Sequence, residues 1–487
     1  MEIKLSSENM QLLPRLYKGM ISLGIGGVLS AAINFGLIFV FSKALSPDEY
    51  GVLAVLMIVL VFFEVAPSLG MNGSILMIYF KKKSDLEKQR LVNTVFVATT
   101  ITSILCLMVV YFFSDRLSHV LMDSNQFAKM IVWVTLGGAL QAGINFNKVY
   151  LRMREQDKSH AYLDVIQPLL RLILVLTFLF LFKLSVQGVI AATILSLGLT
   201  WILSNYQNVR NLNAGFDTRS LGSLLHLGWP ILFAWVISWG MNSLDRLMLN
   251  HLIDLSTVGI YAFALQLTMS LQLLLVAPIE KIWPSLLFQY ESHPDLNNRF
   301  KKILSIFLIA SCAFVTILLL FADELYYFFL PASYYSSRGY LALTAIIPVM
   351  LGLNVFAGSG ARLKRKMTAF PIGLVITALI GFQLNMTFIE RWGAYGAALA
   401  TIATHLIMNT LYFYYSQRVH RFDLPWRTIL FSFMYLGALA VLHIFIFNLD
   451  WLLGLSLINV IILFLIKIAL VVSFASFAFG KLKQLKV

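Results

Sequence analysis

Charged side chains are scarce in this chain of 487 residues. Asp, Glu, Lys and Arg together make up 12% of it, whereas a soluble domain carries about 25%. Hydrophobic residues account for 59% of the chain, which is more apolar surface than one soluble core can bury. The low charge content therefore excludes an ordinary soluble protein and predicts an integral membrane protein.

Cysteines and the sequence signatures of enzymes are also nearly absent. The two cysteines, Cys106 and Cys312, lie in apolar runs, where small buried hydrophobic residues are expected rather than a disulfide or metal ligands. The sequence has no phosphate-binding P-loop, no His-Glu-x-x-His pattern and no clustered metal ligands. We therefore expect no catalytic residue, no metal site and no bound cofactor, and we predict that the protein is not an enzyme.

Long apolar runs recur at the length that a membrane crossing requires. At about 20 residues per crossing they predict an all-α membrane protein with about fourteen transmembrane helices. The first run, 20–42, is too long for a cleavable signal peptide. The predicted spans are 20–42, 51–80, 91–113, 127–149, 160–182, 186–207, 224–248, 258–289, 303–321, 339–360, 367–389, 393–416, 428–447 and 452–479.

Lysine and arginine are distributed unevenly between the two sides of these spans. Of the 37 Lys and Arg residues, 27 fall in loops on the side that carries both termini, and six fall on the other side. Cytoplasmic loops are enriched in positive charge, so we expect both termini to be cytoplasmic. The net charge of +14 is then mostly a topology signal, and it does not predict binding to nucleic acid.

Three separate parts of the sequence recur 208 positions further on. The segments at 51–54, 188–193 and 154–158 match those at 259–262, 396–401 and 362–366. We therefore predict two homologous halves of six helices, 1–208 and 209–417, followed by two further helices in 418–487. An even number of spans per half gives both halves the same orientation, as in transporters built from parallel repeats with a site between them.

Charged side chains inside the predicted spans are the first candidates for a substrate site, because a charge in the bilayer must face protein or water. Arg171 lies in the middle of the fifth span, where it fits a cation of a central cavity or a structural partner of Glu64. Lys281 follows Glu280 in the eighth span, on a stretch flanked by two prolines. Lys281 fits a second cavity cation or a salt bridge at the inner mouth, and Glu280 a coupling or gate residue.

The other charged candidates also have two interpretations each. Asp245 and Arg246, at the outer end of the seventh span, fit a gate or structural ion pair as well as a substrate contact. Lys467, in the last span, fits a cavity lining or a contact with a lipid headgroup. Glu64 and His405 lie in mid-span and fit either coupling residues or satisfied buried groups. Predicted interhelical hydrogen bonds, or sugar contacts, involve Asn34, Gln141, Asn145 and Asn242.

Several short motifs resemble those of a known family. The loop at 42–51 contains Leu-Ser-Pro-Asp-Glu-Tyr-Gly and is similar to the "LSPxEfG" loop of bacterial polysaccharide-export flippases. The segment at 69–74 resembles their "LGlxxa" segment, and 228–230, 245–246 and 258–261 follow their "P…DR…vGxY" pattern. In this order, over about 20–417, the motifs resemble the Wzx-type O-antigen flippases, in the same superfamily as MATE exporters and the lipid II flippase.

The resemblance implies a function and a location. Such a protein moves an oligosaccharide on undecaprenyl diphosphate from the cytoplasmic to the periplasmic leaflet of the bacterial inner membrane, for O-antigen or for capsular or exopolysaccharide synthesis. It works by alternating access of a cleft between two halves. The implied partners are the lipid-linked oligosaccharide, the bilayer, a polysaccharide polymerase and a chain-length regulator. Coupling to H⁺ or Na⁺ is left open.

Two other classes of protein compete with this interpretation. A MATE-type drug or cation antiporter typically has twelve spans and acidic residues for its cationic cargo, whereas about fourteen spans with Arg171 and Lys281 favour an anionic cargo. A membrane enzyme such as a polymerase or acyltransferase is disfavoured by the internal duplication and by the short outer loops, the longest of which is 322–338.

Overall fold

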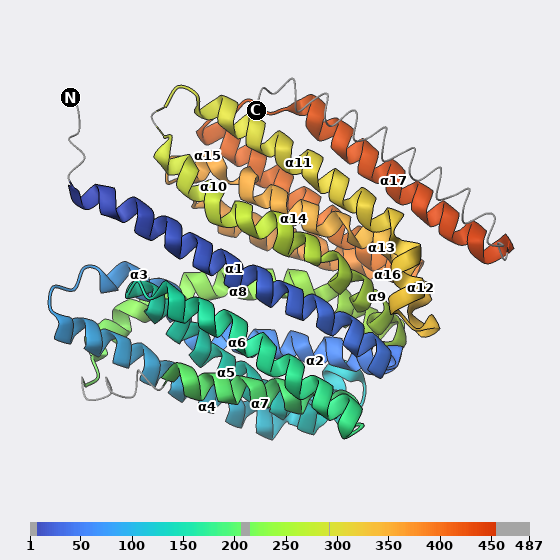
Figure 1. Ribbon diagram of the computed structural model, residues 1–487, viewed down its shortest axis with the longest axis horizontal. Coiled ribbons are helices and arrows are strands. Elements are labelled where there is room, and N and C mark those ends of the chain that lie inside the picture. Colours follow the sequence, from blue (N-terminus) through green and yellow to red (C-terminus); the bar gives the residue numbers. More distant parts are fainter. Residues whose placement is uncertain (1–6, 206–214, 292, 454–487) are drawn as a thin grey trace. The chain divides into compact units, whose positions relative to one another are not determined.

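The protein is built from helices throughout the part of the chain that the structure describes. A computed structural model describes residues 7–205, 215–291 and 293–453, with side chains from Gly26 to Ile446 within them. All regular elements in these ranges are helical (Figure 1). The predicted all-α membrane fold is confirmed.

The helices gather into two compact units. Unit 1 comprises the residues up to Leu45 and Val52–Trp239, and unit 2 comprises Ser46–Gly51 and the residues from Gly240. The helices of unit 1 are α1 (Ser7–Ala44), most of α2 (Pro47–Val65), η1 (Ala66–Ser68), α3 (Met71–Tyr79), α4 (Asp85–Met122), η2 (Asn125–Phe127), α5 (Ala128–Met153), α6 (Asp157–Leu176), η3 (Thr177–Leu181), α7 (Val186–Asn205) and the first part of α8 (Thr218–Leu252).

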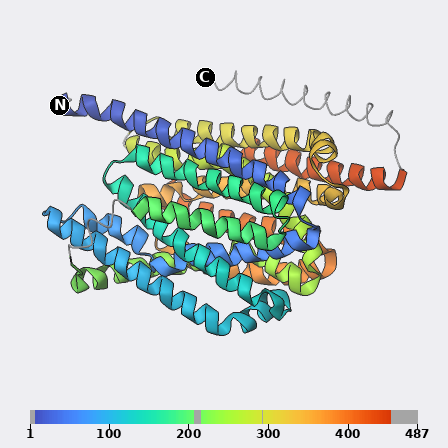
Figure 2. The same ribbon diagram turned by 60° about the horizontal axis from the view of Figure 1, so that its bottom comes forward.

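Unit 2 begins within α8. Its helices are α9 (Leu255–Thr268), η5 (Gln272–Val276), α10 (Ala277–Gln289), α11 (Leu296–Leu320), α12 (Ala322–Phe329), η6 (Ala332–Ser337), α13 (Arg338–Thr344), α14 (Ile346–Ala357), α15 (Ser359–Leu363), α16 (Ala369–Val419) and α17 (Trp426–Leu453). In unit 1, α1 packs against α6 and α5 packs against both α4 and α7 (Figures 1 and 2). In unit 2, α14 packs against α16 and α11 against α17.

Twelve helical segments in the described ranges are long and apolar enough to cross a membrane. One of them is α16, with 51 residues, which at 1.5 Å per residue is about 75 Å, more than twice the hydrocarbon thickness. Gly393 interrupts α16 with a φ of 54° and a ψ of −131°, so this element contains the eleventh and twelfth predicted spans. The fourteenth, 452–479, lies almost wholly outside the described residues, and the total of about fourteen stays a prediction.

The two longest predicted spans are interrupted rather than continuous. The second has a short 3₁₀ turn, Ala66–Ser68, and then Leu69 and Gly70 with φ of 47° and 77°. At Gly70 an added Cβ would lie 2.0 Å from the carbonyl oxygen of Gly228, so glycine permits both the left-handed backbone and the close approach. The eighth contains the π-helix Gln272–Val276 before Pro278. Each of these two spans thus contains a local change of helix geometry.

The sequence motif at 42–51 has a structural meaning at the start of α2. The backbone N–H of Ser46 donates to Glu49 Oε2 at 2.8 Å, and the Glu49 N–H donates to Ser46 Oγ at 3.3 Å. This is a capping box, with Pro47 at the first helical position, where its missing N–H costs nothing. At the start of α9, Asp254 Oδ1 accepts from the Thr257 N–H at 2.6 Å. Both helices therefore begin at side-chain caps.

The glycines of the repeated motif, Gly51 and Gly259, lie where two backbones nearly touch within unit 2. A Cβ added to Gly51 would lie 2.0 Å from the carbonyl oxygen of Leu255, and one added to Gly259 would lie 1.9 Å from that of Pro47. No other residue type fits such a crossing. The repetition of glycine in the sequence therefore reflects a packing requirement.

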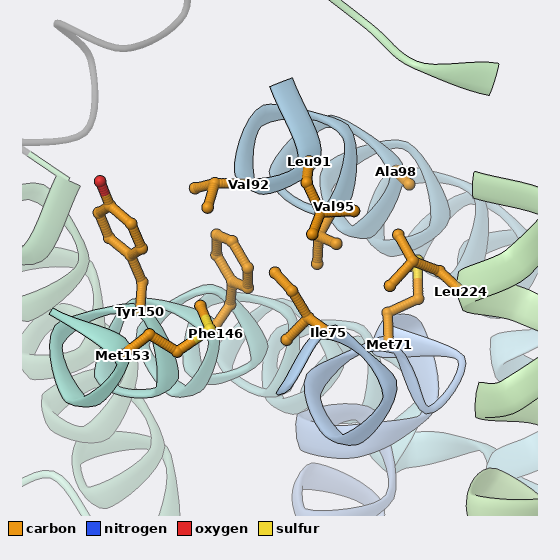
Figure 3. Packing of buried hydrophobic residues seen from close by; sticks show 10 residues of the cluster. All are labelled: Met71, Ile75, Leu91, Val92, Val95, Ala98, Phe146, Tyr150, Met153 and Leu224. Atoms are coloured by element: carbon orange, nitrogen blue, oxygen red, sulfur yellow. The ribbon is translucent and has the colours of Figure 1, made fainter. Parts of the chain in front are cut away.

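A hydrophobic cluster joins α3, α4, α5 and the start of α8 in unit 1. Its residues are Met71, Ile75, Leu91, Val92, Val95, Ala98, Phe146, Tyr150, Met153 and Leu224 (Figure 3). Each is at most 9% exposed. Close packing of these side chains fixes the ends of α3, α4, α5 and α8 against one another.

Candidate functional site

A chain of polar side chains runs through unit 1 between α2, α5 and α6. Asn145 donates to Glu64 Oε1 at 3.0 Å, and Gln141 donates to Asn145 Oδ1 at 2.9 Å. Gln167 on α6 donates to Gln141 Oε1 at 2.6 Å. The predicted role of Gln141 and Asn145 in interhelical hydrogen bonding is therefore observed, and Glu64 is the carboxylate on which the chain ends.

Three further ionisable groups, Lys148, His160 and Asp164, lie on α5 and α6. Lys148 Nζ lies 2.7 Å from Asp164 Oδ1, and His160 Nδ1 lies 3.2 Å from Asp164 Oδ2. Lys148 also interacts electrostatically with Glu64. The lysine, expected only as a cytoplasmic loop cation, thus pairs with Asp164, and Asp164 contacts the side-chain nitrogens of two residues at once.

Arg171 lies on α6, four residues beyond Gln167 and therefore on the same helix face. Its side chain is half-buried, and its guanidinium carbon lies 5.8 Å from the centroid of the Phe41 ring. A guanidinium over an aromatic face is stabilised by the ring quadrupole. Arg171 is thus held by α1 and α6, and its predicted role as a substrate-binding cation stays a prediction.

The Asp245–Arg246 pair belongs to a buried polar group in unit 2. Arg246 Nε lies 3.5 Å from Asp245 Oδ1, and the Tyr261 hydroxyl on α9 donates to Asp245 Oδ2 at 2.8 Å. The Arg246 side chain also donates to the backbone carbonyl of Asn242. Asp245 is 2% exposed, so its carboxylate is satisfied by groups of unit 2 itself. These contacts support the interpretation of Asp245 and Arg246 as a structural ion pair.

Glu280 and Lys281 are both exposed on α10. Glu280 interacts electrostatically with Arg362 of α15 rather than with its neighbour in the sequence, as expected because adjacent helical residues point about 100° apart. Arg362 is half-buried and donates to the carbonyl of Val355 at 3.2 Å. The charge that acts on Glu280 is thus that of Arg362, which the sequence alone placed in a basic loop.

The remaining candidates are less informative. His405 on α16 is 2% exposed, which fits a buried group as well as a coupling residue. Lys467 lies outside the described residues. Cys106 and Cys312 are free thiols, half-buried and buried. Within the ranges that the structure describes, no three His, Cys, Asp or Glu side chains gather as metal ligands would.

Comparison with known proteins decides the family. A sequence model for the family described as polysaccharide biosynthesis protein matches residues 40–338, more than half of the chain. The chain belongs to the polysaccharide biosynthesis protein family. The matched region includes the capped loop at 42–51 and the buried groups around Glu64 and Asp245, so the resemblance to polysaccharide-export flippases is confirmed at the level of the family.

Solved structures show that this family member has the fold of known transporters. The lipid II flippase MurJ in an inward closed conformation matches with a TM-score of 0.70 and 16% identity, over 96% of this chain and 99% of that one. A multidrug resistance MATE family transporter of the MOP superfamily matches in its inward-facing conformation with a TM-score of 0.64 and 15% identity, over 83% and 97% of the two chains. Its outward-facing conformation gives a TM-score of 0.58 and 14% identity, over 82% and 95%.

No protein with a curated function matches the chain in sequence. At identities of 14–16% the structural matches establish the fold and not the cargo. The polysaccharide biosynthesis family member is thus a multi-pass membrane protein with a flippase and transporter fold.

Sequence reasoning missed several residues that the fold brings together. His160, Asp164 and Gln167 share one face of α6 with Arg171, at spacings of four, three and four residues. That helical periodicity of polar residues was visible in the sequence and could have identified the stripe. The contribution of Tyr261 to Asp245 had no such signal, because the two lie on different helices.

Proposed function

We propose that this protein flips an oligosaccharide on undecaprenyl diphosphate across the bacterial inner membrane, from the cytoplasmic to the periplasmic leaflet. The family match, to polysaccharide biosynthesis proteins over 40–338, is the observation that carries the proposal. The product would feed O-antigen or capsular or exopolysaccharide synthesis, together with a polymerase and a chain-length regulator. No covalent step is required, because the cargo only changes leaflets.

The proposed mechanism is alternating access with cations along the route of the cargo. A diphosphate and several sugars cannot cross ~30 Å of hydrocarbon unaided. A fixed cation in a poorly solvated region lowers the barrier for an anion by more than it would in bulk water. Arg171 and Lys281 are the proposed cations, and Arg246 and Lys467 are further candidates; Arg171 is half-buried within its helix bundle and Lys281 is exposed on α10.

The experiment compares surface polysaccharide in variants of these cations. Arg171→Ala should reduce export sharply while the amount of protein in the membrane stays normal. Arg171→Lys should keep part of the activity, because it retains the charge but loses the planar fork. Arg116→Ala is the matched control, since Arg116 is an exposed arginine near the end of α4. Wild-type export in both Arg171→Ala and Lys281→Ala would refute the cationic mechanism.

The orientation is part of the same proposal. Both termini are proposed to be cytoplasmic, because 27 of the Lys and Arg residues lie on their side. Single cysteines replacing the exposed Lys83, Glu155 and Arg365 should resist a membrane-impermeant thiol reagent added from outside, and cysteines at Asp115 and Lys183 should react. The reverse pattern would invert the topology and the proposed direction of transport.

A further inference from the structure

A cavity opens between α4, α5 and α7 in unit 1. Its volume is about 120 Å³. Phe96 of α4, Phe146 of α5 and Trp201 of α7 line it, and Phe146 also belongs to the hydrophobic cluster of unit 1 (Figure 3). Two further lining residues, Ile104 and Leu136, are 48% and 40% exposed. The cavity therefore reaches the surface of the protein.

The cavity exists because small residues face it from two neighbouring helices. Thr99 and Ser103 lie one turn apart on α4, and Ala139 and Gly143 lie one turn apart on α5. Small residues at this spacing let membrane helices approach closely, but here the space between them stays open. A Cβ added to Gly143 would lie 2.5 Å from Trp201 Nε1, so Trp201 packs directly against the α5 backbone and closes one side of the cavity.

The lining of the cavity suits hydrocarbon better than water. The Thr100 hydroxyl donates to the Phe96 carbonyl at 2.8 Å, and Thr99 Oγ1 is covered by protein and bonds to no group that the structure describes. The other lining side chains are apolar except for Ser103 and the N–H of Trp201. A buried water needs about 2–4 polar partners, whereas an apolar cavity of about 150 Å³ in another protein stays dry and holds benzene or xenon. The cavity therefore fits an apolar group of about the size of a benzene ring.

The position of the cavity along its helices places it deep in the membrane. All three helices are long and apolar enough to cross a membrane. Ser103 and Ile104 are the two central residues of α4, with 18 residues on either side. Leu140, which also lines the cavity, is one of the two central residues of α5, with 12 residues on either side of that pair. Hydrocarbon surrounds the middle of a membrane-crossing helix, so lipid chains are the material that meets the mouth of the cavity.

From this geometry we propose that the cavity between α4, α5 and α7 is a binding site for a hydrocarbon chain of a membrane lipid. A segment of the chain enters between Ile104 and Leu136 and packs against Phe96, Phe146 and Trp201. An empty cavity would leave these side chains without contacts on one side, and the chain supplies those contacts. The bound chain also keeps α4 and α5 apart where their small residues would otherwise let them close. The site lies within unit 1 and does not rest on the proposed transport of a lipid-linked oligosaccharide.

The test uses the purified full-length protein in phospholipid nanodiscs, without cargo and with a phospholipid that carries a diazirine in the middle of one acyl chain. After irradiation, mass spectrometry of peptides locates the labelled residues. We expect label at Phe96 and Trp201 as well as at Met108, which is 51% exposed on α4 outside the cavity. In Ser103→Leu the label at Phe96 and Trp201 should fall by roughly tenfold relative to Met108, the loss expected when about two chain methylenes can no longer be buried.

Two further variants decide whether the label reports the cavity. Ala139→Leu fills it from the opposite helix and should give the same loss, which keeps the test decisive if Ser103→Leu does not fold. Ser114→Leu adds the same side chain to α4 outside the cavity and should change nothing. A wild-type protein labelled at Met108 but not at Phe96 or Trp201 would show that no chain enters. That result would overturn the proposal, and so would undiminished label in both filled variants.

A competition experiment identifies which lipid supplies the chain. Unlabelled polyprenyl phosphate is added to the nanodiscs and compared with the same amount of ordinary unlabelled phospholipid. Equal effects of the two on the label at Trp201 would assign the site to a phospholipid acyl chain. A selective loss of the Trp201 label with polyprenyl phosphate, at constant Met108 label, would assign it to a polyprenyl chain. Both results support a hydrocarbon-chain site and name its source.

Discussion

Two basic turns, one in each unit, have the same backbone and different supports. In each turn three successive N–H groups bond to carbonyls four, three and five residues back, at Arg154 to Gln156 and again at Lys364 to Lys366. The residue with positive φ is Glu155 in the first turn, at 57°, and Arg365 in the second, at 56°. The backbone hydrogen bonds are thus matched at an offset of 210 rather than the 208 of the sequence match.

The supports of the two turns differ in kind. The helix end before the first turn is fixed by Tyr150 and Met153, which belong to the hydrophobic cluster of unit 1 (Figure 3). The second turn is fixed by a hydroxyl, since Ser416 Oγ accepts from the N–H groups of Gly360 at 2.7 Å and Ala361 at 3.3 Å. The comparison teaches that a local turn can recur while its tertiary anchor is replaced.

The largest expected effect comes from filling the space beneath the second turn. A Cβ on Gly360 would lie 2.6 Å from the Ser416 carbonyl oxygen and 2.7 Å from that of His420. Both are backbone atoms and cannot rotate away, so Gly360→Ala should destabilise the protein by about 3 kcal/mol or more. Thermal unfolding in detergent measures the effect. Gly437→Ala is the control, because nothing lies within 4 Å of its added Cβ; equal unfolding temperatures for the two variants would contradict the close approach.

A smaller loss is expected when the hydroxyl anchor itself is removed. Ser416→Ala leaves the buried N–H groups of Gly360 and Ala361 without their acceptor, which should cost about 1–3 kcal/mol. Hydrogen exchange should quicken at residues 360, 361 and 366 and stay unchanged at 154–156. Ser114→Ala, which removes a hydroxyl that donates to the Tyr111 carbonyl in an exposed position, should change neither region. Faster exchange in both turns would mean that they unfold together.

The next largest effect is expected from a change of pH, which should alter the stability of the second turn. Burial, and then repulsion by Lys364, lower the pKa of His420, which follows the last turn of α16. An unfolded histidine has a pKa of about 6.5, so below that pH the unfolded chain binds more protons and the second turn loses stability as the pH falls. Unfolding temperatures at about pH 8 and pH 5.5 should differ less in His420→Gln than in the wild type. An unchanged difference would show that His420 is not the titrating group.

The smallest effect should be the same in both turns. A non-glycine residue in the left-handed region is strained by roughly 1–2 kcal/mol. Substitution by glycine relieves this strain but costs roughly 0.5–1 kcal/mol in chain entropy. Glu155→Gly and Arg365→Gly should each therefore stabilise slightly and by similar amounts. Glu155→Ala and Arg365→Ala separate the loss of charge from the backbone effect. Clearly unequal gains would mean that the tertiary anchors, and not the local φ, control these positions.

The sequence identified some residues of the candidate site but not the contacts that they make. Arg171, Glu64 and Asp245 were selected because a charge inside a membrane span needs a partner or water. Their contacts were not foreseen, because Asn145 meets Glu64 across 81 positions of the sequence and Tyr261 meets Asp245 from another helix. The roles of the candidate residues in transport, and the division into halves at 208 and 417, remain predictions.

The sequence by itself determined the solvent, the secondary structure and the order of the spans. Apolar runs of membrane length must form helices, because a lipid environment leaves backbone groups no other hydrogen-bond partners. Only the tertiary structure decided where the long spans are interrupted, at Ala66–Ser68 and Gln272–Val276, and which polar groups meet on α2, α5 and α6. Those features depend on contacts between helices distant in the sequence, such as Gly70 against Gly228, which no local pattern of residues encodes.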